Sequence, residues 1–203
     1  CSKKACIHLE VETGLNRTGF NAKNLEKALE LIKKNEEHLE LRGICTHLAG
    51  AESSTNYLRI QNQIKAYEKA VEQVEESGLK AKYHHAVCSA GCFFYPEMQM
   101  NMVRVGIAQY GLWPSAETKI QYLKKIDDKS VDPLKRVISW KSRVMSTKKV
   151  ESGEFIGYGT TFLATQDMLL ATIPVGYANG FSRALSNTGR VLIKGIRCSV
   201  IGL

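Results

Sequence analysis

Residues 5–49 read ACIHLEVETGLNRTGFNAKNLEKALELIKKNEEHLELRGICTHLA, and this stretch decides the fold class. It opens and closes with runs of buried-strand residues, 5–11 and 41–49. The intervening segment, 21–35, carries apolar residues three or four positions apart and begins with Asn21, a residue that can cap a helix. The apolar positions are Leu25, Ala28, Leu29 and Ile32. The stretch therefore predicts a strand, an amphipathic helix and a second strand.

The same alternation continues downstream. A helical stripe over 57–76 is followed by two further strand-like runs, 83–90 and 102–112, while the connection 91–101 is ambiguous. Strands joined by helices run parallel and need cover on both faces, which predicts an α/β fold. Four strands cannot close an eight-stranded barrel, so either the sheet is open and doubly wound or it is the second half of a barrel. The start at Cys1, without a methionine, favours the barrel.

The character of the chain changes near 131–133, where a proline follows Asp132. Short β-like runs over 136–145, 169–175 and 190–193 are separated by turns that contain glycine, with no long helical stripe. We therefore expect two domains, a barrel portion over 1–132 and the first part of a mostly β domain over 133–203.

The composition indicates a soluble globular protein, with 44% hydrophobic and 24% charged residues among 203. No apolar run reaches the roughly 18 residues of a membrane span and no signal peptide is visible, so we expect a cytoplasmic location. The net charge of +8 arises from 28 basic residues interspersed with 20 acidic ones, typical of solvated helix faces rather than of nucleic-acid binding. The cysteines lack a paired CxxC spacing, so we expect buried free thiols and no metal site. They are Cys1, Cys6, Cys45, Cys88, Cys92 and Cys198.

Polar residues gather where the predicted strands end, which is where barrel enzymes keep their chemistry. Arg17, in the loop after the first strand, is able to bind a carboxylate, or is an ordinary surface arginine beside a glycine turn. His47 ends the second strand, where a lone histidine is more often a satisfied core residue. Ser89 lies at the end of the third predicted strand and Gly106 and Ile107 lie in the fourth, where they offer hydroxyl and backbone donors for a phosphate, or form plain small-residue turns.

The most specific pattern lies in the second half. The segment 157–162 reads GYGTTF and the segment 173–183 reads IPVGYANGFSR, which places Tyr158 and Tyr177 nineteen positions apart. Glycines around two tyrosines on a β domain also occur as turns with aromatic caps. The resemblance to a known family, given next, favours a functional site.

With these motifs in order, the chain resembles the alanine racemase family, pyridoxal-phosphate enzymes of fold type III with a TIM-like barrel and a C-terminal β domain. The motifs that carry the resemblance are Glu12-Thr13-Gly14, Thr46-His47, Ser89, Arg104-Val105-Gly106, Gly157-Tyr158-Gly159 and Gly176-Tyr177. The resemblance implies an α/β fold comprising the second half of a TIM-like (β/α)8 barrel followed by part of the β domain. It implies a racemase that interconverts L- and D-alanine by two-base proton transfer with pyridoxal 5'-phosphate, supplying D-alanine for cell-wall synthesis.

The resemblance also implies roles for single residues. Tyr158 is the expected catalytic base, tuned by His47 and Arg104, and Arg104 also faces the pyridine nitrogen of the cofactor. The remaining implied roles are substrate binding by Arg17, Tyr177, Arg183 and Glu10, and cofactor binding by Ser89, Gly106, Ile107 and His47. In the family the tyrosine reaches the partner subunit's cofactor, so a homodimer of the full-length protein is implied.

Several positions depart from the family pattern. Glu10 stands where many members carry a carbamylated lysine, and we read it as a fixed carboxylate that substitutes for that group. Cys88 and Asn179 replace a usual asparagine and aspartate. The cofactor-binding lysine of the family is expected upstream of Cys1 and further substrate contacts beyond Leu203, so these 203 residues alone are expected to be inactive.

Three rival functions remain open. A related racemase for serine or for several amino acids would share these motifs, because discrimination depends on segments outside the chain. A non-catalytic pyridoxal-phosphate-binding protein would generally lack the β domain and its tyrosines. A nucleic-acid-binding module has only the positive charge in its favour.

Overall fold

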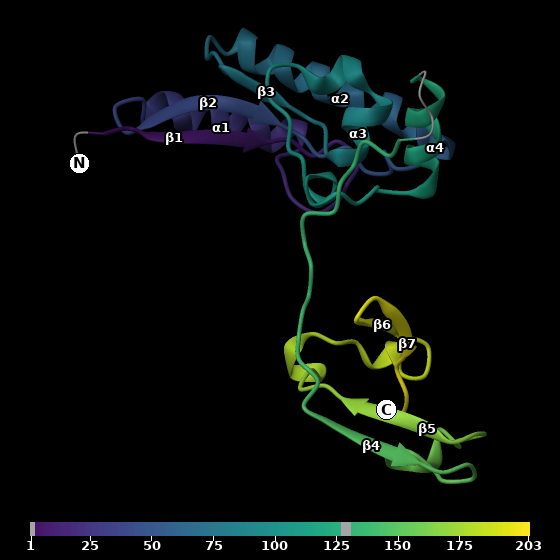
Figure 1. The fold of residues 1–203 in the computed structure, drawn as a ribbon. Helices are drawn as coiled ribbons and strands as arrows, with labels where there is room; N and C mark the ends of the chain where they lie inside the picture. Colours follow the sequence, from purple (N-terminus) through teal and green to yellow (C-terminus); the bar gives the residue numbers. More distant parts are fainter. Residues whose placement is uncertain (1–2, 127–130) are drawn as a thin grey trace. The chain divides into compact units, whose positions relative to one another are not determined.

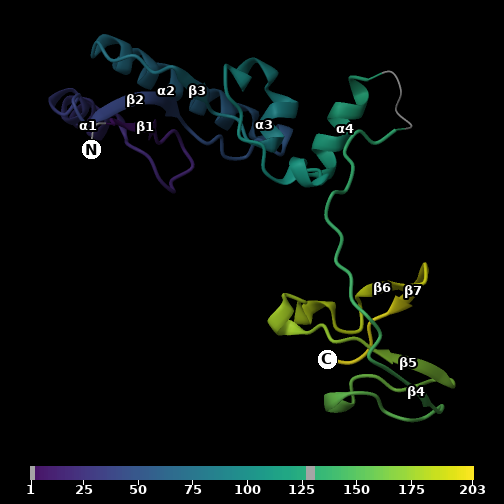
Figure 2. The same cartoon turned by 60° about the vertical axis from the view of Figure 1, so that its left-hand side comes forward.

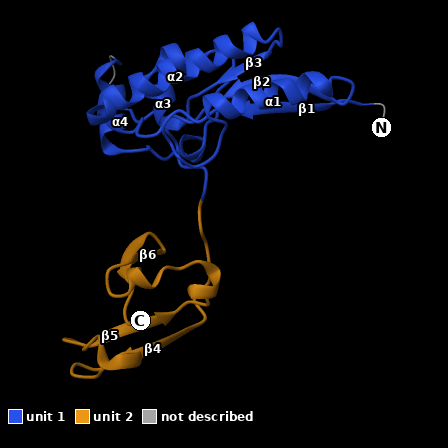
Figure 3. Cartoon of the chain, turned by 180° about the vertical axis from the view of Figure 1, so that it is seen from behind, with its two compact units in different colours: residues 1–138 blue, residues 139–203 orange. Residues whose placement is uncertain are grey.

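The computed structural model describes residues 3–126 and 131–203. The chain forms two compact units, residues 1–138 and residues 139–203, which Figure 3 shows in separate colours. Each unit is described by itself below.

Unit 1 is built on a three-stranded sheet in which all neighbours are parallel, as predicted. The strands are β1 (Ala5–Glu10), β2 (Leu39–Cys45) and β3 (Tyr83–His85), in that spatial order (Figure 1). The register between β1 and β2 shifts after Ile7, so that His8 pairs with Gly43. Parallel strands end at one edge of their sheet, so the loops that follow β1, β2 and β3 gather there.

Helices α1 (Ala22–Lys34) and α2 (Tyr57–Glu76) form the predicted crossovers and lie along the strands (Figure 2). Asn21 caps α1 as expected, its side-chain oxygen accepting a hydrogen bond from Asn24 N at 3.0 Å. The apolar stripe of each helix is buried in one hydrophobic core with β1 and β2. The Tyr67 hydroxyl, buried in that core, donates to the Ile44 carbonyl at 3.0 Å and ties α2 to the middle strand.

The fourth predicted strand, 102–112, does not form. Its first half is extended but has a single backbone bond to the segment after β3, from Arg104 N to Val87 O at 3.2 Å. A single hydrogen bond does not make a β-ladder. The chain then forms the 3-10 helix η3 (Ile107–Tyr110), which ends at Gly111 with a left-handed φ of 75°. Apolar alternation predicted a strand where no partner strand is present among the described residues. The ambiguous connection and the region after it contain α3 (Ser89–Phe94), η2 (Pro96–Gln99) and α4 (Ala116–Lys124).

Unit 2 is made of two antiparallel hairpins and short 3-10 turns, in line with the β character predicted for it. The predicted run 190–193 is β6 (Arg190–Ile193), which pairs with β7 (Ile196–Ser199), and the run 169–175 overlaps β5 (Met168–Thr172). The predicted run 136–145 is wrong. The strand that pairs with β5 is the polar β4 (Ser146–Val150), because partner register, not local apolarity, selects the paired residues.

Two composition-based expectations can be compared with the structure. No helix among the described residues is long and apolar enough to cross a bilayer. Of the cysteines expected to be buried free thiols, Cys45 is buried, three are half-buried and Cys6 is exposed. Cys1 lies outside the described residues.

Candidate functional site

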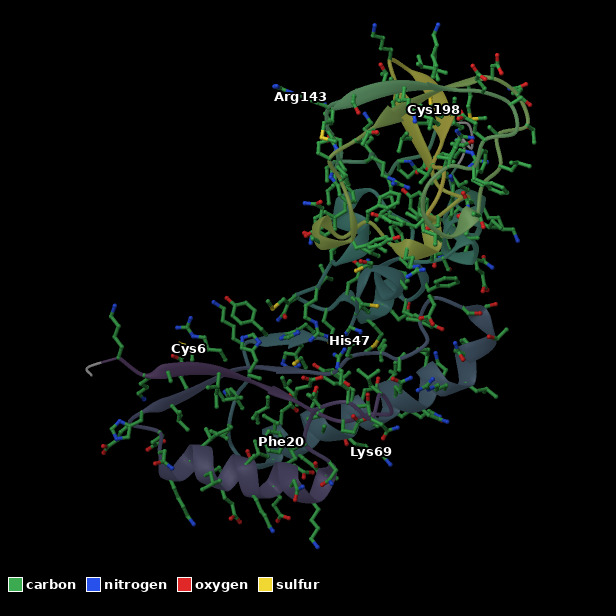
Figure 4. All side chains as sticks on the ribbon, turned by 90° about the horizontal axis from the view of Figure 1, so that it is seen from below. Cys6, Phe20, His47, Lys69, Arg143 and Cys198 are labelled. Carbon is green, nitrogen blue, oxygen red and sulfur yellow. The ribbon has the colours of Figure 1, made fainter. Side chains whose placement is uncertain are left out.

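The carboxyl edge of the sheet in unit 1 gathers most of the predicted site residues. Glu10, Cys45 and His85 are the last residues of β1, β2 and β3 and pair with one another in register. His47 follows two positions after β2, and in Figure 4 it lies at this edge, away from Cys6 near the start of β1. The edge thus brings a carboxylate, a thiol and imidazoles together at one end of the sheet.

Ser89 and the backbone after Arg104 form a small cradle of polar groups. The buried Ser89 hydroxyl accepts hydrogen bonds from Gly106 N at 2.9 Å and from Ala108 N at 3.3 Å. A Cβ at Gly106 would lie 3.9 Å from the Ser89 hydroxyl oxygen, so the glycine leaves this side of the cradle open. Ile107, the third residue predicted here, lies between the two donating amides and is 44% exposed. A hydroxyl beside two convergent amides is an arrangement suited to an anion.

Arg104 lies beside the cradle, and backbone carbonyls of the residues that follow β2 and β3 hold its guanidinium. Its Nη2 donates to the Thr46 carbonyl and, at 3.5 Å, to the Ala86 carbonyl. Its Nε is buried and has no partner among the described residues. A buried donor without a partner is costly, so Nε marks the place where an acceptor would be bound.

The electrostatics of the edge favour a neutral His47. Burial lowers the pKa of His47, the charges of Arg104 and Arg17 lower it further, and Glu10 acts in the opposite direction. Burial together with Glu10 raises the pKa of the Cys45 thiol, against the influence of Arg104. Both residues are therefore uncharged near neutral pH, beside a permanently charged guanidinium.

The structure adds a histidine pair that sequence reasoning missed. His8 Nδ1 and His85 Nε2 lie 2.7 Å apart, and the His8 ring also stacks on Tyr83 with centroids 5.8 Å apart. Gly43 of β2 lies between the two strands, and a Cβ there would come within 2.5 Å of His8 Nδ1. The sequence offered one indication of this pair, because side chains alternate along β1 and place His8 on the same face of the sheet as Glu10.

The loop that carries Arg17 starts at the same edge. Arg17 itself is exposed, and no ion pair joins it to Glu10 among the described residues. The Thr13 and Thr46 hydroxyls lie 2.7 Å apart and connect the base of the loop to the end of β2. Glu10 and Arg17 thus both lie near His47, whose pKa the two charges shift in opposite directions.

The remaining predicted residues lie in unit 2. Tyr158 opens the 3-10 turn η4 (Tyr158–Thr160) and is 86% exposed. Tyr177 opens η5 (Tyr177–Asn179), and the exposed Arg183 opens η6 (Arg183–Leu185). Each side chain is open to a partner, and the backbone turns that present them are made by the glycines of the two motifs. Gly157 and Gly159 have φ values of 78° and 71°, which favour glycine.

Within residues 3–126 and 131–203 there is no group of three or more His, Cys, Asp or Glu side chains placed to hold a metal ion. The hydrogen-bond donors next to Ser89 are instead the Arg104 guanidinium, the Ser89 hydroxyl and backbone amides. This combination of groups suits an anionic organic ligand.

Comparison with known proteins agrees with this class of site. The alanine racemase N-terminal domain matches residues 1–114, and the alanine racemase C-terminal domain matches residues 137–203. The chain belongs to the alanine racemase family. It is 35% identical over 201 residues to alanine racemase 1 of Oceanobacillus iheyensis and 37% identical over 201 residues to the alanine racemase of Symbiobacterium thermophilum. In both cases the match covers 98% of this chain and 50% of the relative, so the chain spans about half the length of these curated relatives.

Solved structures give the same result. The alanine racemase from Bacillus anthracis with bound L-Ala-P has a TM-score of 0.84 and 28% identity over 99% of this chain and 50% of its own. The alanine racemase from Bartonella henselae with covalently bound pyridoxal phosphate has a TM-score of 0.73 and 29% identity over 98% of this chain and 50% of its own. The predicted fold class, a portion of a TIM-like barrel followed by a β domain, is confirmed by these neighbours and by the two matched domains.

Proposed function

We propose that the protein is a pyridoxal-phosphate-dependent alanine racemase, which interconverts L- and D-alanine and supplies D-alanine for cell-wall synthesis. The observation that carries the proposal is the match of both racemase domains, in order, over residues 1–114 and 137–203. In domain terms, residues 1–132 would form the C-terminal half of the cofactor-binding barrel and residues 133–203 the first part of the β domain. The match to the C-terminal domain counts against a protein that only binds pyridoxal phosphate.

The residues present fit pyridoxal phosphate. Ser89 and the amides of Gly106 and Ile107 would hold the phosphate, at the place where the Gly106 and Ala108 amides converge on the Ser89 hydroxyl. The Nε of Arg104, which is buried and has no partner in the part of the chain that the structure describes, would donate to the pyridine nitrogen. When bound, the cofactor supplies the electron sink that makes the α-proton of alanine acidic.

Arg104 would also set the electronic character of that sink. Its guanidinium stays protonated and is fixed by the Thr46 and Ala86 carbonyls, so it would donate a hydrogen bond to the ring nitrogen without transferring its proton. A ring nitrogen that stays unprotonated withdraws fewer electrons. This arrangement would favour return of a proton to the α-carbon of alanine over side reactions that need a longer-lived carbanion.

Tyr158 is the proposed base for the L-alanine face of the substrate. A free phenol has a pKa of about 10 and needs positive or hydrogen-bonding neighbours to act near neutral pH. We assign His47 and Arg104 to that task, in a homodimer in which Tyr158 comes from the partner subunit. The 86% exposure of Tyr158 supports its delivery to another chain.

Substrate recognition is assigned to four further residues. Arg17 would bind the carboxylate of alanine with its two-pronged guanidinium, and Glu10 would supply the negative charge that positions it. Tyr177 and Arg183 would line the entrance. We further propose that the full-length protein works in the cytoplasm.

The direct test is racemisation of alanine by the full-length protein with pyridoxal phosphate, comparing wild type with Tyr158→Phe. Loss of a proton-transfer group typically costs about 10²–10⁴ in rate, so kcat should fall by that factor while Tyr122→Phe, in the aromatic cluster of unit 1, stays near wild type. Racemase activity untouched by Tyr158→Phe would move the base elsewhere. Absence of activity in the wild type would refute the function, and a higher rate on serine than on alanine would favour the related racemase.

A further inference from the structure

Glu12, two residues after β1, has its carboxylate enclosed by the loop that follows it. One carboxylate oxygen accepts a hydrogen bond from Gly14 N at 2.5 Å and the other accepts from Asn16 N at 2.9 Å. Partial burial raises the pKa of Glu12, but backbone donors outweigh it and the pKa is lowered overall. These donors are the amides of Asn16, Gly14, Leu15 and Arg17. The carboxylate is therefore charged at neutral pH and the loop backbone is arranged around its charge.

The loop has the shape of an anion-binding backbone turn. Gly14 has a φ of 134° and Asn16 a φ of 58°, so successive amides point inward to one concave side. Such turns commonly receive a phosphate or another external anion. Here the anion is Glu12 of the same chain, which fills the turn from within.

The base of this loop is fixed on rigid parts of unit 1. Arg59 of α2 donates to the Gly14 carbonyl at 2.9 Å. A Cβ at Gly14 would lie 3.2 Å from Gln63, whose buried amide in turn bonds to Ala49 N at 2.7 Å and Ala49 O at 3.0 Å. The first half of the loop is thereby fixed to α2, and its far end is fixed by backbone hydrogen bonds between Phe20 and residues 10 and 12 of the chain. Arg17 lies between these two anchors, directly after the backbone that surrounds Glu12.

We propose that Glu12 is a positioning residue that sets the direction of Arg17 through the loop backbone. The inference rests on the proposed function, in which Arg17 binds the substrate carboxylate. Glu12 does not touch substrate. It fixes the amides of residues 14 and 16, and so determines how the arginine leaves the loop.

The test is Glu12→Gln in the full-length enzyme with pyridoxal phosphate. Glutamine keeps one acceptor oxygen but turns an NH₂ group towards the second amide, so two donors face each other. We expect KM for alanine, and the inhibition constant of propionate, which has the carboxylate but no amine, to rise about tenfold while kcat stays within about threefold. Glu12→Asp, with both oxygens, should recover most of the loss, and Glu30→Gln on the exposed face of α1 should match wild type.

Hydrogen exchange of the backbone supplies a readout that does not need catalysis. The amides of residues 14–17 should exchange about tenfold faster in Glu12→Gln, with the rest of unit 1 unchanged. Unchanged exchange, or a fall in kcat with KM and propionate inhibition constant as in wild type, would overturn the inference. If wild type does not racemise alanine, the proposed function fails, and loop exchange together with propionate binding still decides whether Glu12 positions the arginine.

Discussion

The imidazoles of His8 and His85 lie 2.7 Å apart, Nδ1 to Nε2, although their strands are separated by β2. His85 is buried, and its second ring nitrogen has no partner among the described residues. Burial, followed by the nearby charges of Arg104, His8 and His84, lowers the pKa of His85 to about 4, while Glu10 acts in the opposite direction. The pair is therefore built around a neutral imidazole.

The stability of the protein should fall as the pH drops from about 6.5 to about 4, because the unfolded His85 takes up a proton there and the folded one does not. The contribution of His85 is fully present above pH 6.5 and is lost towards pH 4, by roughly 2–3 kcal/mol of unfolding free energy. Urea unfolding across this range measures it. His85→Gln should flatten this part of the profile, and His38→Gln, at an exposed position, should not. Equal slopes in wild type and His85→Gln would contradict the assignment.

Ser89→Ala should weaken cofactor binding, because the Gly106 and Ala108 amides lose the oxygen that orders them. Loss of one charged or buried hydrogen bond corresponds to about a tenfold rise in the dissociation constant of pyridoxal phosphate. Absorbance titration of the full-length protein with the cofactor measures it, with Ser152→Ala in unit 2 as an exposed control. Equal affinity in the Ser89 variant would place the phosphate elsewhere.

Gln63→Leu should destabilise unit 1 by about 2–4 kcal/mol, because the Ala49 N–H and carbonyl both lose their buried partner. Leucine matches the size of glutamine, so a lost hydrogen-bond pair rather than a cavity is tested. Denaturant unfolding measures the free energy of unfolding of this variant and of the control Gln73→Leu, at a half-buried position on the same helix. A stability equal to wild type would show that the Ala49 groups find other partners.

Glu10→Gln should raise KM for alanine severalfold in the full-length enzyme, since the variant removes a fixed negative charge near Arg17 and His47. Steady-state kinetics with Glu36→Gln as control measure the change. An unchanged KM would show that Glu10 does not substitute for a carbamylated lysine.

The spacing of apolar residues along the chain predicted the helices and strands that bury one face and have polar residues at both ends. The two long helices were placed closely, because Leu25, Ile60 and their neighbours recur at helical spacing. The runs 5–11 and 41–49 overlap β1 and β2, whereas the run 83–90 is longer than β3, which ends at His85. The spacing failed at 102–112 and 136–145, where pairing depends on partner strands that are distant in sequence. The candidate site was reached through family motifs, and its carboxyl-edge grouping through the parallel topology. The Glu12 loop and the His8–His85 pair needed the structure, since both depend on backbone geometry and on register.

The contact between the two histidines depends on an atom that is absent. Any side chain at Gly43 would place its first carbon within 2.5 Å of His8 Nδ1. A single methyl group at this position would therefore push the His8 ring away from His85. The buried His85 imidazole would lose the hydrogen bond that fixes its tautomer. In this sheet, side chains of the two outer strands are in contact because the middle strand has no side chain at Gly43.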